Sequence, residues 1–402
     1  MSIATQPTPA PSGPRASQNI GLVLGILVSA GMLLLGPPQG LQQAGWTVAA
    51  LAALMAIWWV TEAVPIPVTS LLPMVVLPLG DISSIKTAAA PYASPIVMLL
   101  MGGFIIAKSI ERWGLHERIA LTIVVRFSAN PNALVGGFML ASAFLSMWIS
   151  NSATTIMLTP IALSVATAVL GQRDVSGAPL TLALLLGLAY SASIGGLGTP
   201  VGTPTNLIVI GYLMDQTGQE ISFSQWMLLG VPAVIIMLPA AWFVLTRLAF
   251  RLQKLETDKG AETLQSRLEA LGPTTTPERR VMIAFLFIAM AWILRKPLNG
   301  LTIGDMSPFA GISDPLIAIA GAIIFFLIPS GDAAAQRSRL LDWDTAQNIP
   351  WGVILLFGGG LSLAGAMTSS GLAAWLGDQM ALLTTLPTIL IILALTAFVI
   401  FA

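Results

Sequence analysis

The sequence predicts an all-α protein that crosses the membrane many times, and three observations lead to this fold class. Of the 402 residues, 55% are hydrophobic and 9% are charged, whereas a soluble domain carries about 25% charged residues. The mean hydropathy of the chain is +0.85, and long apolar segments recur along its whole length. A water-soluble fold could not cover so much apolar surface with so little charge, so we expect a polytopic membrane protein.

The N-terminal tail, residues 1–19, is rich in Pro, Ser and Thr and contains one charged residue, Arg15. This composition is typical of a disordered segment. The apolar run that follows, 20–35, is not preceded by the basic stretch that begins a signal peptide. We therefore predict a first transmembrane helix and its loop over 20–45.

Twelve further apolar segments follow, and several are shorter than the roughly 20 residues of a straight span. Two neighbouring pairs meet at polar or Gly/Pro-rich breaks, the first at 150–152 and the second at 198–204. Short, interrupted segments of this kind indicate re-entrant hairpins and broken helices. The twelve segments lie at about 46–62, 66–80, 93–110, 132–149, 153–170, 179–197, 205–214, 224–247, 281–296, 313–329, 350–369 and 385–402.

A hydrophilic stretch, 247–280, contains seven basic residues and is expected to be a water-exposed cytoplasmic linker between two halves. If the tail is cytoplasmic and 132–170 is one re-entrant hairpin, 15 of the 18 Lys and Arg residues lie on cytoplasmic segments. The positive-inside rule favours this arrangement. We therefore predict a multi-pass protein of the inner or plasma membrane with a cytoplasmic N-terminus. Reading the hairpin as two full spans gives the same later orientation, so charge leaves that choice open.

A weak internal repeat relates the two halves. The matches are 77–80 with 328–331, Gly102-Gly103 with Gly358-Gly359, and Gly114-Leu115 with Gly371-Leu372, the last two at offsets of 256 and 257. The span count gives the two copies opposite directions, so the repeat is inverted. Inverted repeats with broken helices are the usual architecture of secondary transporters. We predict a first repeat over 46–246 and a second over 281–402.

The two breaks carry polar groups without formal charge. A helix that begins at a break presents free N–H groups, which suit an anion, and one that ends there presents carbonyls, which suit Na⁺. The alternative is that Ser and Thr only tune helix packing, but their coincidence with two breaks favours a binding site. The candidate residues are Ser146, Ser150, Asn151, Ser152, Thr154, Thr155, Thr159, Gly198, Thr199, Gly202, Thr203, Thr205 and Asn206.

Composition also excludes several classes of function. The formal net charge is zero, so no global field attracts nucleic acid. The chain has no cysteine and one histidine, His116, which excludes disulfides, thiolate sites and multi-histidine metal sites within it. An intramembrane enzyme would need a nucleophile–base pair or a metal cluster at membrane depth. That class therefore stays a remote alternative, and we expect a protein that is not an enzyme.

Three stretches resemble the divalent anion/sodium symporter family. They are Ser150-Asn151-Ser152-Ala153-Thr154-Thr155 followed by Pro160, the Gly/Thr-rich stretch 192–206, and 58–65 with the sequence Trp-Trp-Val-Thr-Glu-Ala-Val-Pro. The resemblance runs from about 46 to the end of the chain. It implies a sodium-coupled symporter of small dianions, most of all C4-dicarboxylates, without an organic cofactor. It also implies a homodimer in which a transport domain moves like an elevator against a scaffold domain.

The resemblance assigns roles to residues at both breaks. It implies a sodium site lined by Ser146, Ser150, Asn151 and Gly198. Asn151, Ser152 and Thr199 would contact a substrate carboxylate. The family usually has Thr where this chain has Ser152, a departure that bears on substrate preference. A sodium-independent dicarboxylate exchanger and a sodium/sulfate symporter of the same family stay open as alternatives.

The repeat yields one further expectation, which concerns the end of the chain. Gly102 precedes Ser150 by 48 residues, so Gly358 should precede a second polar tip near position 406 or 407. The chain stops at Ala402, inside an apolar run, where a terminal carboxylate is costly. We therefore expect a C-terminal truncation that leaves the second repeat and half of the binding site incomplete, and a fragment that does not transport alone.

Overall fold

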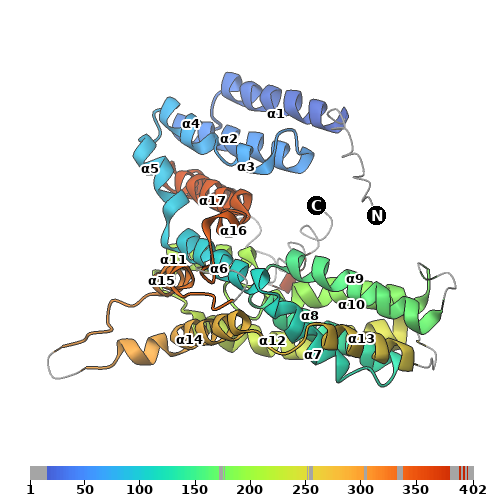
Figure 1. Cartoon of the computed structure of the whole chain (residues 1–402). Helices are drawn as coiled ribbons and strands as arrows, with labels where there is room; N and C mark the ends of the chain where they lie inside the picture. The colour runs from blue at the N-terminus through green and yellow to red at the C-terminus, as the bar shows by residue number, and fades with distance from the viewer. Residues whose placement is uncertain are drawn as a thin grey trace, which may run out of the picture. The chain divides into compact units, whose positions relative to one another are not determined.

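The computed structural model describes residues 16–171, 175, 177–250, 252, 257–302, 306–332, 338–380, 389, 390, 393 and 396. These residues form helices joined by short loops, and an isolated antiparallel bridge links Pro329 to Arg339 (Figure 1). The predicted all-α class is confirmed. The predicted tail up to residue 15 and most of the predicted segment 385–402 lie outside the described residues.

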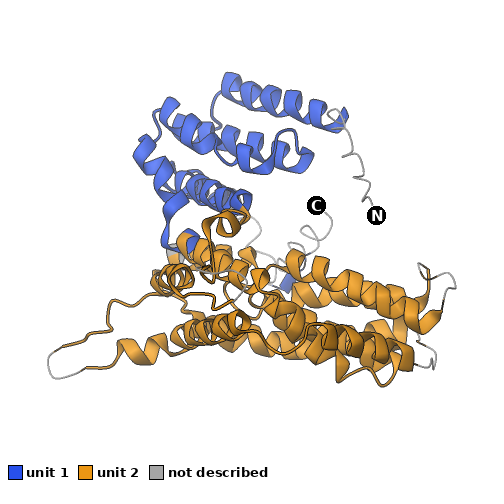
Figure 2. Cartoon of the chain, viewed as in Figure 1, with its two compact units in different colours: residues 1–97, 351–402 blue, residues 98–350 orange. Residues whose placement is uncertain are grey.

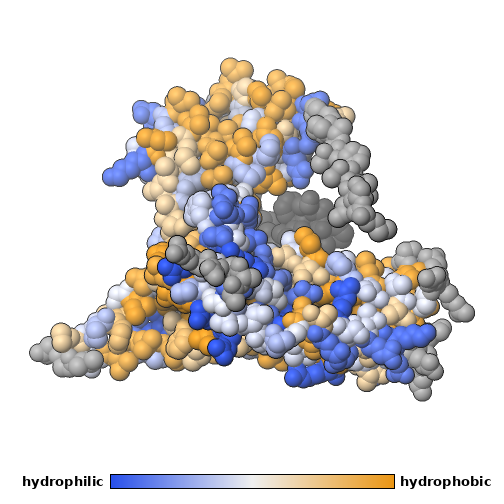
Figure 3. All heavy atoms as spheres, in the orientation of Figure 1, coloured by the Kyte–Doolittle hydropathy of each residue, from blue (hydrophilic) through white to orange (hydrophobic). Residues whose placement is uncertain are grey.

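Eight helices of the described residues are long and apolar enough to cross a membrane. Only 11% of the apolar window of the first helix and 17% of that of the sixth are buried inside the protein. The apolar side chains of these two helices are therefore free to face lipid, in which a helix pairs its own backbone groups. On the face that Figure 3 shows, hydrophobic residues gather over the helices of residues 16–79, at the top of the view, and are mixed with hydrophilic residues elsewhere. The eight are Ala16–Leu35, Gln43–Thr61, Ile85–Arg112, Asn151–Leu170, Pro179–Gly196, Phe223–Ala249, Thr276–Asn299 and Trp351–Ser369. The chain is therefore a multi-pass membrane protein, as the composition predicts.

The chain divides into two compact units (Figure 2). The first comprises 1–97 and 351–402, and the second comprises 98–350. Each predicted repeat contributes to both units, because the units join helices from the beginning and the end of the sequence. Both breaks and all the candidate site residues belong to the second unit.

The first unit has its core around α2. Its helices are α1 (Ala16–Leu35), α2 (Gln43–Thr61), α3 (Ile66–Thr69), α4 (Leu72–Leu79), α5 (Ile85–Ala89), η1 (Ala90–Ala93), α17 (Trp351–Ser369) and α18 (Leu372–Met380). Leu51 and Met55 of α2 pack with Leu77 of α4 and Leu372 of α18. The predicted segment 66–80 is broken into α3 and α4, so it is two short helices rather than one.

The second unit contains α6 (Pro95–Arg112), α7 (Leu115–Val125), α8 (Pro131–Ser146), α9 (Asn151–Leu170), α10 (Pro179–Gly196), α11 (Pro204–Thr217), α12 (Phe223–Phe243), the π-helical turn η2 (Val244–Ala249), α13 (Asp258–Ala270), α14 (Thr276–Asn299), α15 (Asp314–Leu327) and α16 (Trp343–Ala346). Helix α10 packs against α8, α9 and α12, and α14 packs against α12 and α15. The stretch expected as a water-exposed linker contains α13, which packs against α7 and α9 through the buried Leu264. One face of this linker is therefore part of the unit.

The strongest matches of the internal repeat have the same local structure. Gly114 follows α6 with φ +67°, and Gly371 follows α17 with φ +77°. Each is the left-handed residue that ends a long helix and directly precedes a shorter one, a conformation that glycine adopts without strain. The match of 77–80 with 328–331 is not of this kind, since Gly80 has φ −83° and Gly331 has φ +73°. The inverted direction of the repeat stays a prediction.

Candidate functional site

The first predicted break separates α8 from α9. Helix α8 ends at Ser146 and α9 begins at Asn151, and the two helices contact each other while both pack on α10. Ser150 is the N-cap of α9: its backbone is extended (φ −59°, ψ 145°) and its Oγ accepts the N–H of Ala153 at 3.2 Å. The side chain of Ser150 thus satisfies one of the free N–H groups with which every helix begins.

The second predicted break separates α10 from α11 and joins the first through Thr199. The hydroxyl of Thr199 donates to the carbonyl of Met147 at 2.5 Å and accepts the N–H of Gly202 at 3.1 Å. The amide of Asn206 donates to the carbonyls of Gly196 and Thr199, both at 2.8 Å. Thr199 and Asn206 are 0% and 2% exposed. Because these bonds are buried, they hold the loop 197–203 in one shape against the first break.

Asn151 and Ser146 meet across the first break. The Ser146 hydroxyl donates to Oδ1 of Asn151 at 2.5 Å. Ser146 is fully buried and Asn151 is half-buried. A Cβ at Gly196 would lie 2.7 Å from the same Oδ1, so only glycine lets α10 approach the amide. The structure therefore brings together Ser146, Asn151 and the C-terminal end of α10.

The remaining predicted residues are placed differently. Gly198 is buried in the second break, where a Cβ would lie 2.8 Å from the Met147 side chain. Ser152 is exposed on the first turn of α9, and the structure does not bring it to the Ser146–Asn151 contact. Thr203 is the N-cap residue of α11 and Thr205 is exposed. Asn206 shapes the loop of the second break through its two hydrogen bonds.

The electrostatics of the site come from dipoles alone. No Asp, Glu, Lys or Arg occurs in 127–172 or 175–214, the segments that form both breaks. The first turn of α9 presents N–H groups and a partial positive charge, which favours an anion. Hydroxyl, amide and carbonyl oxygens surround it, and such neutral oxygen donors suit a hard cation. These residues therefore fit Na⁺ and an anionic group side by side.

Some groups that hold the two breaks in place could not be predicted from the sequence. The Met147 carbonyl is a backbone group with no side-chain signal, and it pairs with Thr199 only because the two breaks meet in space. Trp226 donates its indole N–H to the carbonyl of Leu197 at 2.9 Å, which attaches the second break to α12. Gly196 is part of a Gly-Gly pair at the end of an apolar segment, a signal from which close helix packing could have been predicted.

Comparisons with known proteins agree with this architecture. The family described as the sodium:sulfate symporter transmembrane region matches residues 16–402. The sodium-dependent dicarboxylate transporter SdcS of Staphylococcus saprophyticus is 37% identical over 389 residues, which cover 96% of this chain and 74% of the relative. SdcS of Staphylococcus aureus is 39% identical over 383 residues, covering 94% and 73%. With such a match over almost its whole length, this chain belongs to the sodium:sulfate symporter family, whose members are transporters and not enzymes.

Proposed function

We propose that this protein is a secondary-active, sodium-coupled symporter of small divalent anions, with C4-dicarboxylates as its substrates. The family and the printed names of the relatives support sodium coupling and dicarboxylate transport. The observation that carries the proposal is that two helix breaks meet through the hydrogen bond from Thr199 to Met147, beside the Ser146–Asn151 contact, in segments that contain no charged residue. A dianion that enters such a site brings its own charge, which a bound cation must offset.

In this proposal the N-terminal end of α9 binds the substrate anion, and the oxygen atoms around it bind sodium. The first turn of α9 offers N–H groups to one substrate carboxylate, with Asn151, Ser152 and Thr199 as the candidate side chains. The oxygens of Ser146, Ser150 and Asn151, with the backbone at Gly198, are the candidate sodium ligands. Asn151 belongs to both sets because its amide accepts through oxygen and donates through nitrogen. Sodium bound there lowers the cost of placing the anion next to it.

The whole protein is proposed to work as a homodimer in the plasma membrane, with its N-terminus in the cytoplasm. A transport domain would carry the site across the bilayer against a scaffold domain. The basic residues of the linker and of the neighbouring helix ends support the cytoplasmic orientation. Alternating movement of one repeat against another is the general behaviour of inverted-repeat transporters.

Uptake into proteoliposomes tests the proposal with the natural gene product. An inward sodium gradient should accelerate accumulation of labelled succinate, and replacing sodium by choline should abolish it. Equal uptake with choline, combined with dependence on internal dianion, would establish the exchanger instead. Sulfate is tested as an unlabelled competitor, because the family description names it. Inhibition by sulfate but not by succinate analogues would identify the sulfate symporter.

A matched pair of variants on α9 tests the site. Asn151→Ala removes the amide that contacts Ser146 and should abolish sodium-driven uptake with normal expression and dimerisation. Thr167→Ala lies on the same helix, where the exposed hydroxyl bonds only the carbonyl of Leu163. That variant should retain uptake within about twofold, because it removes a single exposed local hydrogen bond. Equal behaviour of the two variants would show that the site is elsewhere.

A further inference from the structure

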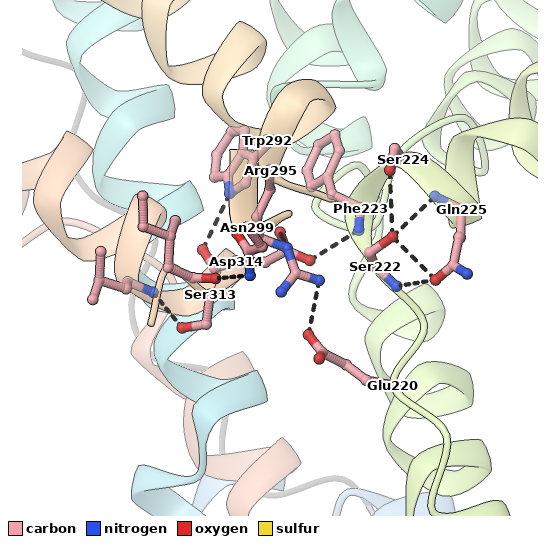
Figure 4. Close-up of polar contacts among 12 residues, drawn as sticks. Glu220, Ser222, Phe223, Ser224, Gln225, Trp292, Arg295, Asn299, Ser313 and Asp314 are labelled. Atoms are coloured by element: carbon pink, nitrogen blue, oxygen red, sulfur yellow. Dashed lines mark hydrogen bonds and ion pairs between the residues drawn. The ribbon is translucent and has the colours of Figure 1, made fainter. Parts of the chain in front are cut away.

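A buried ion pair lies outside both breaks, where α14, α15 and the start of α12 meet (Figure 4). Arg295 Nε is 2.8 Å from Asp314 Oδ1, and the two side chains are 4% and 7% exposed. Arg295 Nη2 also lies 2.8 Å from the half-exposed Glu220. A buried pair contributes little net stability, but each charge is costly without its partner. The pair is therefore a strong constraint on where these helix ends lie.

The carboxylate of Asp314 also fixes the beginning of α12. Its Oδ2 accepts the backbone N–H of Phe223 at 2.9 Å. Phe223 is the first residue of α12, so this N–H has no partner inside its own helix. Asp314 is likewise the first residue of α15, so one carboxylate serves the positive ends of two helices. Phe223 is thereby held in a defined place beside α14.

A row of stacked aromatic rings continues from Phe223 to the first break. Its ring stacks on Trp292 at a centroid distance of 4.7 Å and on Trp148 at 6.2 Å. Phe285, two turns before Trp292 on α14, forms a T-shaped pair with Trp148, with the two ring centroids 5.0 Å apart. The indole N–H of Trp292 donates to the Asp314 carbonyl at 3.1 Å. Trp148 is thus clamped between a residue of α12 and a residue of α14.

Trp148 belongs to the break itself. The residue before it, Met147, accepts the Thr199 hydroxyl, and two residues after it Ser150 caps α9. The four residues 147–150 therefore have one anchor to the second break and another to the aromatic row. A shift of the Trp148 ring would rotate the backbone from which the Ser146–Asn151 contact is built.

We propose that Phe223, anchored by Asp314, positions Trp148 and through it the break that carries the candidate sodium site. The role rests on the proposed sodium-coupled transport, and none of the four aromatic residues is among the candidate sodium or substrate ligands. Phe223, Phe285 and Asp314 are positioning residues. They act on ion affinity through the geometry of 147–150.

Sodium dependence of uptake provides the first test. Phe223→Leu and Phe285→Leu remove one ring each and should raise the sodium concentration for half-maximal succinate uptake by about threefold to tenfold. The maximal rate should change less than twofold, because the ligands themselves remain. Phe287→Leu is the matched control, since Phe287 lies on the same helix and is 73% exposed. A half-saturating sodium concentration equal to that of the control in both variants would overturn the proposal.

A thiol probe tests the geometry without transport. The chain contains no cysteine, so Ser152→Cys supplies a unique reactive group on the first turn of α9. In this background and without sodium, Phe223→Leu and Phe285→Leu should change the maleimide labelling rate by about threefold or more. Phe287→Leu should leave it unchanged. Rates equal to the control would refute positioning, whereas an absence of any sodium effect on labelling would refute only the sodium-coupled function.

Two variants of Asp314 test whether its carboxylate anchors Phe223. Asp314→Asn retains an oxygen that can accept the Phe223 N–H, whereas Asp314→Ala does not. Labelling at position 152 should therefore change more in D314A than in D314N. Where D314A fails to fold, the same comparison is made between Asp314→Asn and Asp314→Asn with Phe223→Leu. Because Asp314→Asn keeps an acceptor for the Phe223 N–H, adding Phe223→Leu to it should still change the labelling rate. An unchanged rate would contradict the proposal that the anchored Phe223 positions Trp148.

Discussion

Removal of the Thr199 hydroxyl is the sharpest test of how the two breaks are joined. Thr199→Val keeps the shape of the side chain but leaves the Met147 carbonyl without its donor, whereas the Gly202 N–H keeps the backbone carbonyl of Thr199 as an acceptor at 3.3 Å. Each buried polar group left unpaired costs about 1–3 kcal/mol. The variant should therefore lose about 1–3 kcal/mol of stability in the second unit, from the one carbonyl left unpaired. Thr199→Ser keeps both bonds and loses one methyl, at about 1 kcal/mol.

The chain offers a matched control on the helix that precedes Thr199. Thr181 of α10 is 1% exposed, and its hydroxyl has no hydrogen-bond partner among the described residues. Thr181→Val should therefore be neutral or slightly stabilising. The assay is the temperature at which the detergent-solubilised protein loses its monodisperse peak on size exclusion. We expect the order T181V, wild type, T199S, T199V from most to least stable.

The same series decides what Thr199 contributes to function. In the structure its hydroxyl donates to the Met147 carbonyl. If Thr199 acts only by shaping the site through this bond, uptake should follow stability across the series. Equal stability of T199V and T181V would refute the reasoning about the joined breaks. Lost uptake in a T199V protein of unchanged stability would instead support direct contact with substrate.

Three further outcomes are expected. Gly102→Ala places a Cβ 2.7 Å from the backbone of α15 and should lower the unfolding temperature, whereas Gly365→Ala, with nothing within 4 Å, should not. Burial lowers the pKa of His116 below its usual 6.5, so its contribution to stability is present above pH 6.5 and is lost as the pH falls through the lowered value. His116→Gln should flatten that part of the melting-temperature profile. The pKa of Asp342 is also lowered: burial opposes ionisation, but hydrogen bonds at the start of α16 and the Arg112 guanidinium outweigh it. Stability from Asp342 is present above pH 3.8 and is lost as the pH falls through the lowered value, a loss that Asp342→Asn should remove when melting is followed in acid.

Much of the fold could be predicted from the sequence, because a membrane imposes strong local rules. Apolar runs predicted most of the long helices to within a few residues, for example 179–197 against α10 (Pro179–Gly196). Gly and Pro marked the breaks, since a helix at membrane depth can stop only where its backbone groups find other partners. The apolar segment 66–80 shows what run length alone leaves open, because it contains two short helices, α3 and α4.

The candidate site shows the same division between local and non-local information. Ser150 as an N-cap is a local feature, and Ser-Asn-Ser at the start of an apolar run indicates it. The link from Thr199 to Met147 spans 52 residues and joins a hydroxyl to a carbonyl, so no side-chain pattern could reveal it. The sodium and substrate roles of these residues stay predictions, which the Asn151 and Thr199 variants address.

The sequence by itself determined that this protein is a multi-pass membrane protein with two uncharged polar breaks, because composition and hydrophobic run length depend only on the chain and the solvent. Only the tertiary structure decided that the breaks touch, that Gly196 gives Asn151 its room, and that Trp148 is clamped by Phe223 and Phe285. These contacts join residues far apart in the chain. Their energies arise from close packing and from partners for buried polar groups, which exist only once the helices have assembled.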